Sequence, residues 1–243
     1  MGATLQLVVP CYNEADRLSP EPFLKQLAIH PELGFIFVDD GSVDGTPARL
    51  ADLTARGGGR ISVITLKQNQ GKAAAVRAGM LAAFERAPAF AGYWDADLAT
   101  PLDAIAEFLT AFDRRPEVDI VIGSRVKLLG RDIHRSPFRH YSGRVFATAA
   151  SMALGISVYD TQCGAKIFRV TDRTRRVFRD PFMSKWIFDV EILSRYVAEV
   201  GTDRADERIY ELALARCTGV AGSKLKPWHA VRAIWDLSVI WRS

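Results

Sequence analysis

The sequence contains few of the residues that build disulfide frameworks or histidine-bound metal sites. Its 3 cysteines (Cys11, Cys163 and Cys217) are widely separated in 243 residues and form no CxxC pair. An odd, scattered set argues against a disulfide-stapled fold and a cysteine-bound zinc, and it suits a reducing compartment. The 4 histidines show no HExxH or similar spacing, so we do not expect a histidine-bound metal.

Long hydrophobic runs and a strong excess of one charge are also missing. The longest nearly uncharged stretch, Val145 to Tyr159, is shorter than the roughly 20 apolar residues that cross a bilayer. Nothing at the N-terminus resembles a signal peptide, so we expect a soluble or peripheral protein. The net charge of +4 is too mild to indicate nucleic acid. With 49% hydrophobic residues, the chain has the composition of a folded globular protein.

The first half alternates between β-rich apolar runs and helical patterns. The expected strands are Leu5–Val9, Phe35–Val38, Ile61–Leu66, Ala91–Trp94 and Val118–Ile122, and the expected helices are Glu21–Ile29, Pro47–Ala55, Gly71–Ala87 and Leu102–Arg114. This alternation predicts an α/β fold, with a mostly parallel sheet and helices on both faces. Thr46 before Pro47 predicts a helix N-cap, and Thr100 before Pro101 repeats the pattern.

The second half has a different texture. An arginine-rich connector (126–140) leads to expected helices at 138–154 and 186–200, a segment at 160–170, a strand at 208–215 and a terminal helix from Pro227. No Pro/Gly/Ser-rich linker separates the halves. We therefore predict one domain over 1–222, made of a first half (1–125) and a second half (126–222), followed by an amphipathic helix at 223–243.

Polar residues follow four of the predicted strands, at Pro10–Glu14, Asp39–Ser42, Asp95–Asp97 and Gly123–Arg125. In open α/β sheets, ligands bind beyond the carboxyl ends of the strands. Any one of these segments taken alone is more simply a solvated loop or a helix cap. Four strand ends together predict a ligand site at this edge of the sheet.

Asp95-Ala96-Asp97 is the clearest candidate for chemistry. On an extended segment alternate side chains share a face, so both carboxylates point the same way and repel each other unless a cation lies near them. Mg²⁺ and Mn²⁺ take hard oxygen ligands, often one or two carboxylates with phosphate oxygens. At the end of a strand, the triplet predicts a site for a divalent metal and a diphosphate.

Two further motifs lie near the expected ligand edge. Asp39 and Asp40 are adjacent on a strand and face opposite sides, so one of them suits a nucleoside and the other a turn. We expect Ser42 and Asp44 to be turn and capping residues. Lys72 belongs to no P-loop, since the GxxxxGK[ST] pattern is absent, and it is either a donor-phosphate contact or a solvated lysine. A GxGxxG fingerprint is absent too, which disfavours a dinucleotide-binding dehydrogenase.

The connector after the fifth strand is rich in arginine, and its members include Arg125, Arg131 and Arg135. The planar guanidinium fork binds phosphate in a bidentate manner. A solvated helix face is the alternative interpretation, and the sequence leaves both open.

Together these motifs resemble family 2 glycosyltransferases of the GT-A fold. The resemblance rests on VVPCYNE (8–14), VDDGSVDGT (38–46), NQGKAAAVRAG (69–79), DAD (95–97) and GSR (123–125), in this order. The second half is similar to the dolichyl-phosphate glucosyltransferase branch, relatives of dolichyl-phosphate mannose synthase. That part of the resemblance rests on DTQCGAKIFR (160–169), KWIFDVEIL (185–193) and GSKLKPWHAVRAIWDL (222–237).

The resemblance implies an inverting transfer of a hexose, with UDP-glucose as the expected donor, onto the phosphate of a polyprenyl phosphate with Mg²⁺ or Mn²⁺ as cofactor. It implies a nucleotide-sugar site formed by Pro10, Tyr12, Glu14, Asp39, Asp40, Lys72, Asp95, Asp97 and Trp186, with Asp95 and Asp97 holding the metal. The implied acceptor-phosphate residues are Arg125, Arg131, Arg135, Gln162 and Lys166, and Asp160 lies on the same side. The implied catalytic residues are Asp95, Asp97, Arg125, Asp189 and Glu191.

Three features keep alternatives open. Ala99 stands where mannose synthases often carry a glutamine, so the resemblance leaves a third protein ligand of the metal open. Phe182 stands where processive relatives carry the glutamine of QxxRW, which disfavours polymer synthesis. A phosphate acceptor needs no strong base, whereas a sugar hydroxyl would need one, and Asp160, Asp189 or Glu191 would supply it. The alternatives are a GDP-mannose-dependent polyprenyl-phosphate mannosyltransferase, a transferase with a glycan or soluble acceptor, and a non-catalytic nucleotide-sugar binder.

The last expected helix carries Trp228, Trp235 and Trp241 on a broad apolar arc, preceded by Lys224 and Lys226. Aromatics with flanking lysines are typical of an interfacial helix, although packing on the protein's own core is the alternative. We therefore expect a peripheral protein on the cytoplasmic, inner face of the cell membrane, with a homodimer as a further expectation.

Overall fold

The computed structural model describes residues 4–126, 129–130, 132–133 and 137–217. Its main strands are β1 (Leu5–Cys11), β2 (Leu33–Asp39), β3 (Ile61–Thr65), β4 (Phe90–Trp94), β5 (Ile120–Ser124), β7 (Ala165–Arg169) and β8 (Ile209–Ala213). A separate parallel pair consists of β6 (Asp132–Ile133) and β9 (Arg216–Cys217). The helices are α1 (Pro20–Ile29), α2 (Thr46–Arg56), α3 (Lys72–Glu85), the 3₁₀ turn η1 (Leu102–Ala104), α4 (Ile105–Arg114), α5 (Pro137–Leu154), α6 (Asp172–Val177), α7 (Phe188–Val200) and α8 (Thr202–Arg208).

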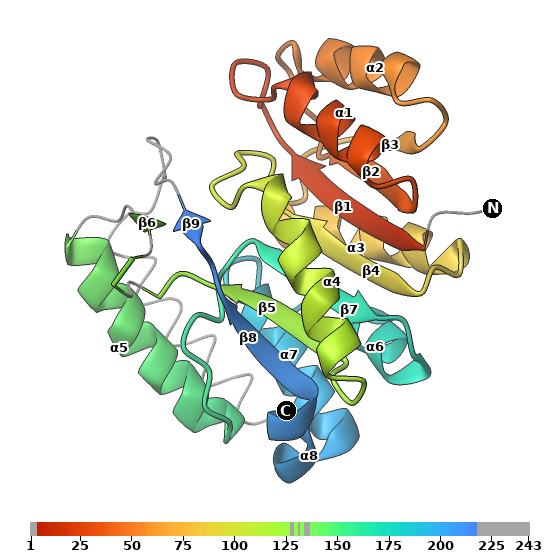
Figure 1. The fold of residues 1–243 in the computed structure, drawn as a ribbon. Coiled ribbons are helices and arrows are strands. Elements are labelled where there is room, and N and C mark those ends of the chain that lie inside the picture. Colours follow the sequence, from red (N-terminus) through yellow and green to blue (C-terminus); the bar gives the residue numbers. More distant parts are fainter. Residues whose placement is uncertain (1–3, 127–128, 131, 134–136, 218–243) are drawn as a thin grey trace.

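The main sheet has seven strands in the order β3-β2-β1-β4-β7-β5-β8 (Figure 1). Neighbouring strands are parallel from β3 to β4 and between β5 and β8, which confirms the predicted mostly parallel sheet. Strand β7 is antiparallel to both β4 and β5 and joins the first four strands to the last two. The sequence pattern did not predict this reversed strand, because alternating strands and helices indicate only parallel crossovers.

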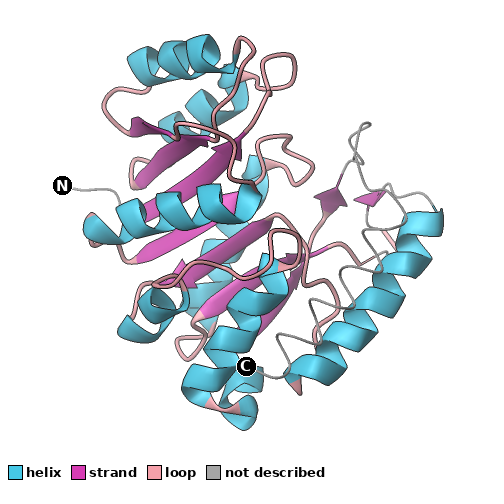
Figure 2. Ribbon diagram, turned by 180° about the vertical axis from the view of Figure 1, so that it is seen from behind, coloured by secondary structure: helices cyan, strands magenta, loops and turns pink. Residues whose placement is uncertain are grey.

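Helices cover both faces of the sheet (Figures 1 and 2). Val8 and Ile36 belong to a buried cluster with residues of α3, α6 and α7, whereas Leu7 and Phe35 belong to a second cluster with residues of α1, α2 and α4. Successive side chains of a strand point to opposite faces, so a strand covered on both faces is apolar at almost every position. Among the described helices, none has the length and hydropathy of a membrane span.

The predicted cap of α2 is corrected by the structure. Thr46 is the first residue of the helix rather than its cap, and Gly45 precedes it. The Thr46 hydroxyl instead accepts the N–H of Glu14 at 2.8 Å, while Asp44 Oδ1 accepts the N–H of Thr46 at 2.9 Å. Ser42 also accepts a backbone N–H, so its prediction and that of Asp44 as turn and capping residues are confirmed. The Thr46 hydroxyl therefore does not cap the helix but links the loop after β1 to the start of α2.

The second predicted cap is also displaced. A 3₁₀ turn begins at Leu102, with Pro101 as its cap residue, so Thr100 is not the cap. The carbonyl of Thr100 accepts the indole N–H of the buried Trp94 at 2.7 Å. This bond satisfies the polar atom of a large side chain at the end of β4.

Candidate active site

A cavity of about 290 Å³ opens at the carboxyl ends of β1, β2 and β4. Its lining comes from four segments that lie far apart in the sequence. Seven predicted site residues line it together, namely Pro10, Tyr12, Glu14, Asp40, Lys72, Asp95 and Asp97. The strand-end clusters therefore meet where the sheet topology places them.

The loop after β1 forms one wall of the cavity and is bonded to the loop after β2. The backbone N–H of Asn13 donates to Ser42 Oγ at 3.0 Å, and Asn13 Oδ1 accepts the N–H of Val43 at 3.0 Å. Asn13 has a φ of 52°, a left-handed conformation that asparagine tolerates better than most residues. The exposed ring of Tyr12 is thereby held at the cavity wall.

Asp39 and Asp40 have the opposite orientations that the strand register predicts. Asp40 Oδ1 and Oδ2 accept the backbone N–H groups of Gln70 and Gly71, at 2.8 and 2.7 Å, and fix the entry of α3. Asp39 Oδ1 accepts the N–H of Ser42 at 3.0 Å and closes the turn after β2. Both carboxylates are buried, but only Asp40 is part of the cavity lining.

Lys72, the first residue of α3, forms an ion pair with Asp95. Its Nζ lies 2.5 Å from Asp95 Oδ1. Burial disfavours the ammonium, but Asp95 and the nearby Asp189 outweigh it and raise the pKa of Lys72. Lys72 is therefore a cation held against the carboxylate at the end of β4.

Gly164 makes room for the Asp95 carboxylate. A Cβ added at Gly164 would lie 1.9 Å from Asp95 Oδ2, far inside van der Waals contact. The carbonyl of Gly164 also accepts the N–H of Asp95 at 2.9 Å. The start of β7 thus shapes the site from the antiparallel strand that the sequence pattern did not predict.

Asp97 and Glu14 add two more carboxylates to the lining. Asp97 Oδ1 accepts the N–H of Ala99 at 3.0 Å. Glu14 Oε1 pairs with Arg17 at 2.7 Å, whereas the buried Oε2 accepts no hydrogen bond from the described residues. Burial raises the pKa of Glu14, and Asp97 and Asp95 add to this against the opposing effect of Arg17.

Hard oxygens in a shared cavity suit Mg²⁺ or Mn²⁺. Within the part of the chain that the structure describes, no three His, Cys, Asp or Glu side chains are grouped closely enough to hold a metal alone. The residues therefore fit a metal that takes one or two carboxylates and completes its coordination with other oxygens, such as those of a phosphate.

Comparison with known proteins identifies the family. The family model described as Glycosyl transferase family 2 matches residues 6–174, more than half of the chain. The chain belongs to glycosyl transferase family 2. The match spans all four segments of the cavity lining, and it continues through β5 and β7.

Curated relatives within the family extend the match to nearly the whole chain. The chain is 36% identical to the dolichyl-phosphate beta-glucosyltransferase of Drosophila melanogaster, over 98% of this chain and 74% of the relative. It is 32% identical to the human protein of the same name, over 97% of this chain and 74% of the relative. These relatives confirm the predicted resemblance to this branch of the family.

Solved structures confirm the predicted GT-A fold. Glucosyl-3-phosphoglycerate synthase of Mycobacterium tuberculosis superposes with a TM-score of 0.69 at 19% identity, over 99% of this chain and 80% of that one. That crystal contains Mn²⁺, UDP-glucose and phosphoglyceric acid. At this identity the likeness is evidence of the shared fold.

Arg125, the predicted phosphate ligand after β5, makes a bidentate ion pair with Asp160. Its Nε and Nη2 lie 2.6 and 2.7 Å from the two carboxylate oxygens. Glu211 on β8 holds the Asp160 turn in place, accepting the N–H groups of Tyr159 and Asp160. Arg125 lies outside the cavity lining, while Arg131 and Arg135 lie outside the described residues.

Lys166 and Asp189 form a buried pair that links β7 to α7. Lys166 Nζ lies 2.5 Å from Asp189 Oδ1 and also donates to the carbonyl of Cys163 at 2.7 Å. The hydroxyl of Tyr93 donates to the same carboxylate oxygen. The structure therefore places Lys166 in the interior, fully buried, rather than at a surface open to solvent.

The remaining predicted residues lie in the second half of the chain. Glu191 is buried on α7, and its carboxylate accepts backbone N–H groups of the preceding loop. Trp186 is half-exposed in that loop, two residues before the observed start of α7 and therefore outside the helix predicted to begin there. Gln162 is exposed in the turn before β7. None of the three is part of the cavity lining.

Sequence reasoning missed several residues that shape the site. Tyr93 and Gly164 contact predicted carboxylates, and Glu211 holds the Asp160 turn. In the sequence, Tyr93 looks like any apolar residue of a buried strand. Glu211 looks like a polar residue on the solvent-facing side of a strand. The adjacency of β4, β7, β5 and β8 brings Gly164 and Glu211 to these positions, and the packing of α7 brings Asp189 to Tyr93.

Proposed function

We propose that this chain transfers glucose from UDP-glucose to the phosphate of a polyprenyl phosphate, with inversion, and yields a lipid-linked monosaccharide. The observation that carries the proposal is the meeting of Asp95, Asp97, Glu14 and Lys72 in one cavity at the ligand edge of the sheet. Relatives named dolichyl-phosphate beta-glucosyltransferase cover nearly the whole chain and support glucose and a lipid phosphate. A polyprenyl-phosphate sugar synthase of Rhizobium johnstonii, 29% identical over 69% of this chain, supports the acceptor class.

In this proposal the first half (1–125) binds the donor and the second half (126–222) binds the acceptor. The nucleotide-sugar residues are Pro10, Tyr12, Glu14, Asp39, Asp40, Lys72, Asp95, Asp97 and Trp186. Because Asp40 binds the N–H groups of Gln70 and Gly71, it places the N-terminus of α3 and Lys72 at the cavity. A helix N-terminus and an ammonium together favour the charge of a diphosphate.

Asp95 and Asp97 would hold the metal, which when bound neutralises charge on the donor diphosphate. The structural neighbour that contains UDP-glucose also contains Mn²⁺, which supports a divalent ion, Mg²⁺ or Mn²⁺. Lys72 Nζ contacts Asp95 Oδ1, so the lysine shares this carboxylate with any ion that binds there. Gly164 keeps the carboxylate at this position because a larger residue would displace it.

The acceptor side suits a phosphate nucleophile better than a sugar hydroxyl. A phosphate monoester carries about −1.5 to −2 charge near neutral pH and needs no strong base. Asp189 Oδ1 already accepts from Lys166 and Tyr93, so this oxygen is committed to the interior. We propose Arg125, which Asp160 holds in place, as a cation for the acceptor phosphate, together with Arg131, Arg135 and Gln162. Lys166, expected in this set from the sequence, is buried and paired with Asp189, so it does not contact the acceptor in this proposal.

A lipid acceptor also requires contact with a membrane. We therefore propose a peripheral enzyme on the inner face of the cell membrane, attached through the amphipathic segment 223–243, which lies outside the described residues. A homodimer remains part of this proposal.

The test uses purified protein, Mg²⁺ or Mn²⁺ and a polyprenyl phosphate in detergent or liposomes. UDP-glucose, UDP-galactose, GDP-mannose and UDP-N-acetylglucosamine are compared as donors, with Asp97→Asn as the inactive control. UDP-glucose should give a lipid-linked sugar that disappears with EDTA. A preference for GDP-mannose would instead identify a mannosyltransferase. If none of the four donors gave a lipid-linked sugar, the proposal would be contradicted.

A further inference from the structure

The loop between α6 and α7, residues 178–187, is held by side chains on neighbouring helices. Arg195 of α7 donates to the carbonyl of Val177, the last residue of α6, at 2.9 Å, and to the loop carbonyls of Asp180 at 2.8 Å and Pro181 at 2.7 Å. Its guanidinium carbon also lies 4.9 Å from the centre of the Phe182 ring. Arg195 therefore holds the backbone in place where α6 ends and the loop begins.

A second arginine binds the carbonyls that Arg195 does not reach. Arg77 of α3 donates to Phe178 O at 3.0 Å and to Arg179 O. Five consecutive carbonyls, from residue 177 to residue 181, therefore accept from guanidinium groups. Since α3 also begins with Lys72, the loop is tied to the helix that enters the cavity.

Glu191 binds the other half of the loop. Its Oε2 accepts the N–H groups of Met183 at 2.9 Å and Ser184 at 3.1 Å, and its Oε1 accepts from Arg195 Nη2 at 2.7 Å. The Ser184 hydroxyl in turn accepts the N–H groups of Trp186 and Ile187, where α7 begins. Glu191 is only 1% exposed, and both of its oxygens are engaged within the protein.

This loop lies against the rim of the cavity. Lys185 Cδ is 3.8 Å from the position that a Cβ would take on Gly71, a lining residue with a φ of +98°. Lys72 Nζ is 6.0 Å from the centre of the Phe188 ring at the start of α7. The bonds made by Glu191 and Arg195 therefore hold the loop that carries Lys185 beside Gly71 at the edge of the cavity.

We propose that Glu191 and Arg195 are positioning residues that hold the 178–187 loop against the cavity and do not touch the substrate. A general base needs a carboxylate oxygen within hydrogen-bond reach of the acceptor, and the oxygens of Glu191 face backbone amides and Arg195 instead. The proposal thus replaces the sequence-based prediction that Glu191 is catalytic. Of the two measurements that test this proposal, only kcat/KM depends on the proposed function.

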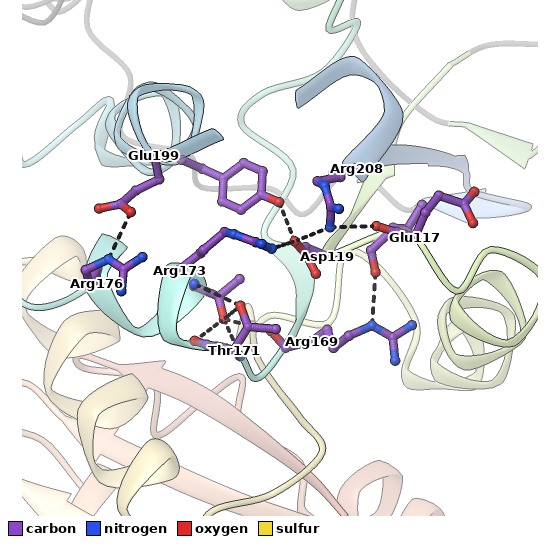
Figure 3. Close-up of polar contacts among 11 residues, drawn as sticks. Glu117, Asp119, Arg169, Thr171, Arg173, Arg176, Glu199 and Arg208 are labelled. Carbon is purple, nitrogen blue, oxygen red and sulfur yellow. Dashed lines mark hydrogen bonds and ion pairs between the residues drawn. The ribbon is translucent and has the colours of Figure 1, made fainter. Parts of the chain in front are cut away.

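The test compares Glu191→Gln, Arg195→Met and the double variant with the wild type. Trypsin cleavage after Lys185, followed by mass spectrometry with and without UDP, reports loop opening independently of turnover. The matched controls are Arg176→Met on α6 and Glu199→Gln on α7, an exposed pair at 2.9 Å whose side chains bond each other rather than the loop (Figure 3). Arg195→Lys, which keeps the charge but loses the fork, serves if Arg195→Met does not fold.

Each single variant should raise the Lys185 cleavage rate and lower kcat/KM by about tenfold or more, because hydrogen bonds to a charged group are lost. The double variant should be little worse than either single one, since both residues hold one loop. The cleavage rate and kcat/KM of Arg195→Lys should lie between those of the wild type and Arg195→Met. UDP should slow cleavage of the wild type, and the two control variants should have wild-type cleavage rates and kcat/KM.

An inactive Glu191→Gln variant with wild-type loop cleavage, beside an unaffected Arg195→Met, would overturn the proposal, because Glu191 would then act directly. Wild-type behaviour of both single variants would overturn it too. If the wild type glycosylates no lipid, the proposed function fails, and the cleavage rates with their response to UDP still decide the loop proposal.

Discussion

Asp119 and Arg208 are joined twice, once through the backbone and once through their side chains. The N–H of Asp119 donates to Arg208 O at 2.9 Å, and Arg208 Nη1 lies 3.2 Å from Asp119 Oδ2. The same oxygen accepts the hydroxyl of Tyr196 at 2.6 Å and lies 3.6 Å from Arg173 Nη1 (Figure 3). This cluster precedes β5, at the opposite end of the strand from Arg125, and links α6, α7 and α8.

Asp119→Ala should therefore reduce stability and leave the cavity intact. The arginine partners are 42% and 30% exposed, so the ion pairs add little, whereas the buried tyrosine hydroxyl loses its charged acceptor. We expect a loss of about 2–3 kcal/mol in the free energy of unfolding, measured by urea denaturation. Asp113→Ala, at an exposed position of α4, should change it by less than about 0.5 kcal/mol. Weakened UDP binding by folded Asp119→Ala would contradict the separation of cluster and cavity.

Lys72→Met should weaken binding of UDP-glucose. Charge-assisted hydrogen bonds contribute about 1.5–3 kcal/mol, so we expect the Kd from calorimetry to rise roughly 10- to 100-fold. Lys67→Met provides the control, because Lys67 is an exposed lysine five residues earlier and is absent from the cavity lining. Equal affinity in the two variants would show that Lys72 serves only to hold Asp95.

Gly164→Ala should disable the site through Asp95. The added Cβ would overlap the carboxylate, since it would lie 2.1 Å from Asp95 Cγ, and the carboxylate would have to move. We expect Mn²⁺-dependent UDP binding to be lost, with a destabilisation of about 1–3 kcal/mol from overpacking. Gly45→Ala is the control, because its nearest neighbour would be Ala15 Cβ at 3.4 Å and its φ is −73°. Retained metal-dependent binding in Gly164→Ala would show that the position of Asp95 is not decisive.

The thiols of Cys11 and Cys163 should react slowly in the native protein. Burial raises the pKa of both, and the neighbouring carboxylate of Glu14 adds to this at Cys11. A raised pKa keeps a thiol protonated at neutral pH, and the reactive species is the thiolate. Iodoacetamide at pH 7.5 followed by peptide mass spectrometry should label these two residues only after denaturation. Rapid native labelling of either would mean that its surroundings open readily.

The part of the cavity lining that lies at the strand ends was largely predictable, because these residues directly follow a strand. Asp95, Asp97, Asp40 and Tyr12 occupy strand ends, and parallel strands bring their carboxyl ends to one edge. The proposed acceptor side was less predictable. Lys166 looks like a phosphate ligand in sequence but faces inward from a strand covered on both sides.

The sequence by itself determined the α/β fold, the ligand edge and the family, because hydrophobic periodicity and strand-end motifs are local properties of the chain. Only the tertiary structure decided which charges are paired. The insertion of β7 between β4 and β5 brought Gly164 to Asp95 and Lys166 to Asp189, and the packing of α7 gave Glu191 the loop amides as partners. The partners of Asp95 and Asp189 come from distant segments, those of Glu191 from the loop before its own helix, and a buried charge is stabilised by whichever groups the packed fold places beside it.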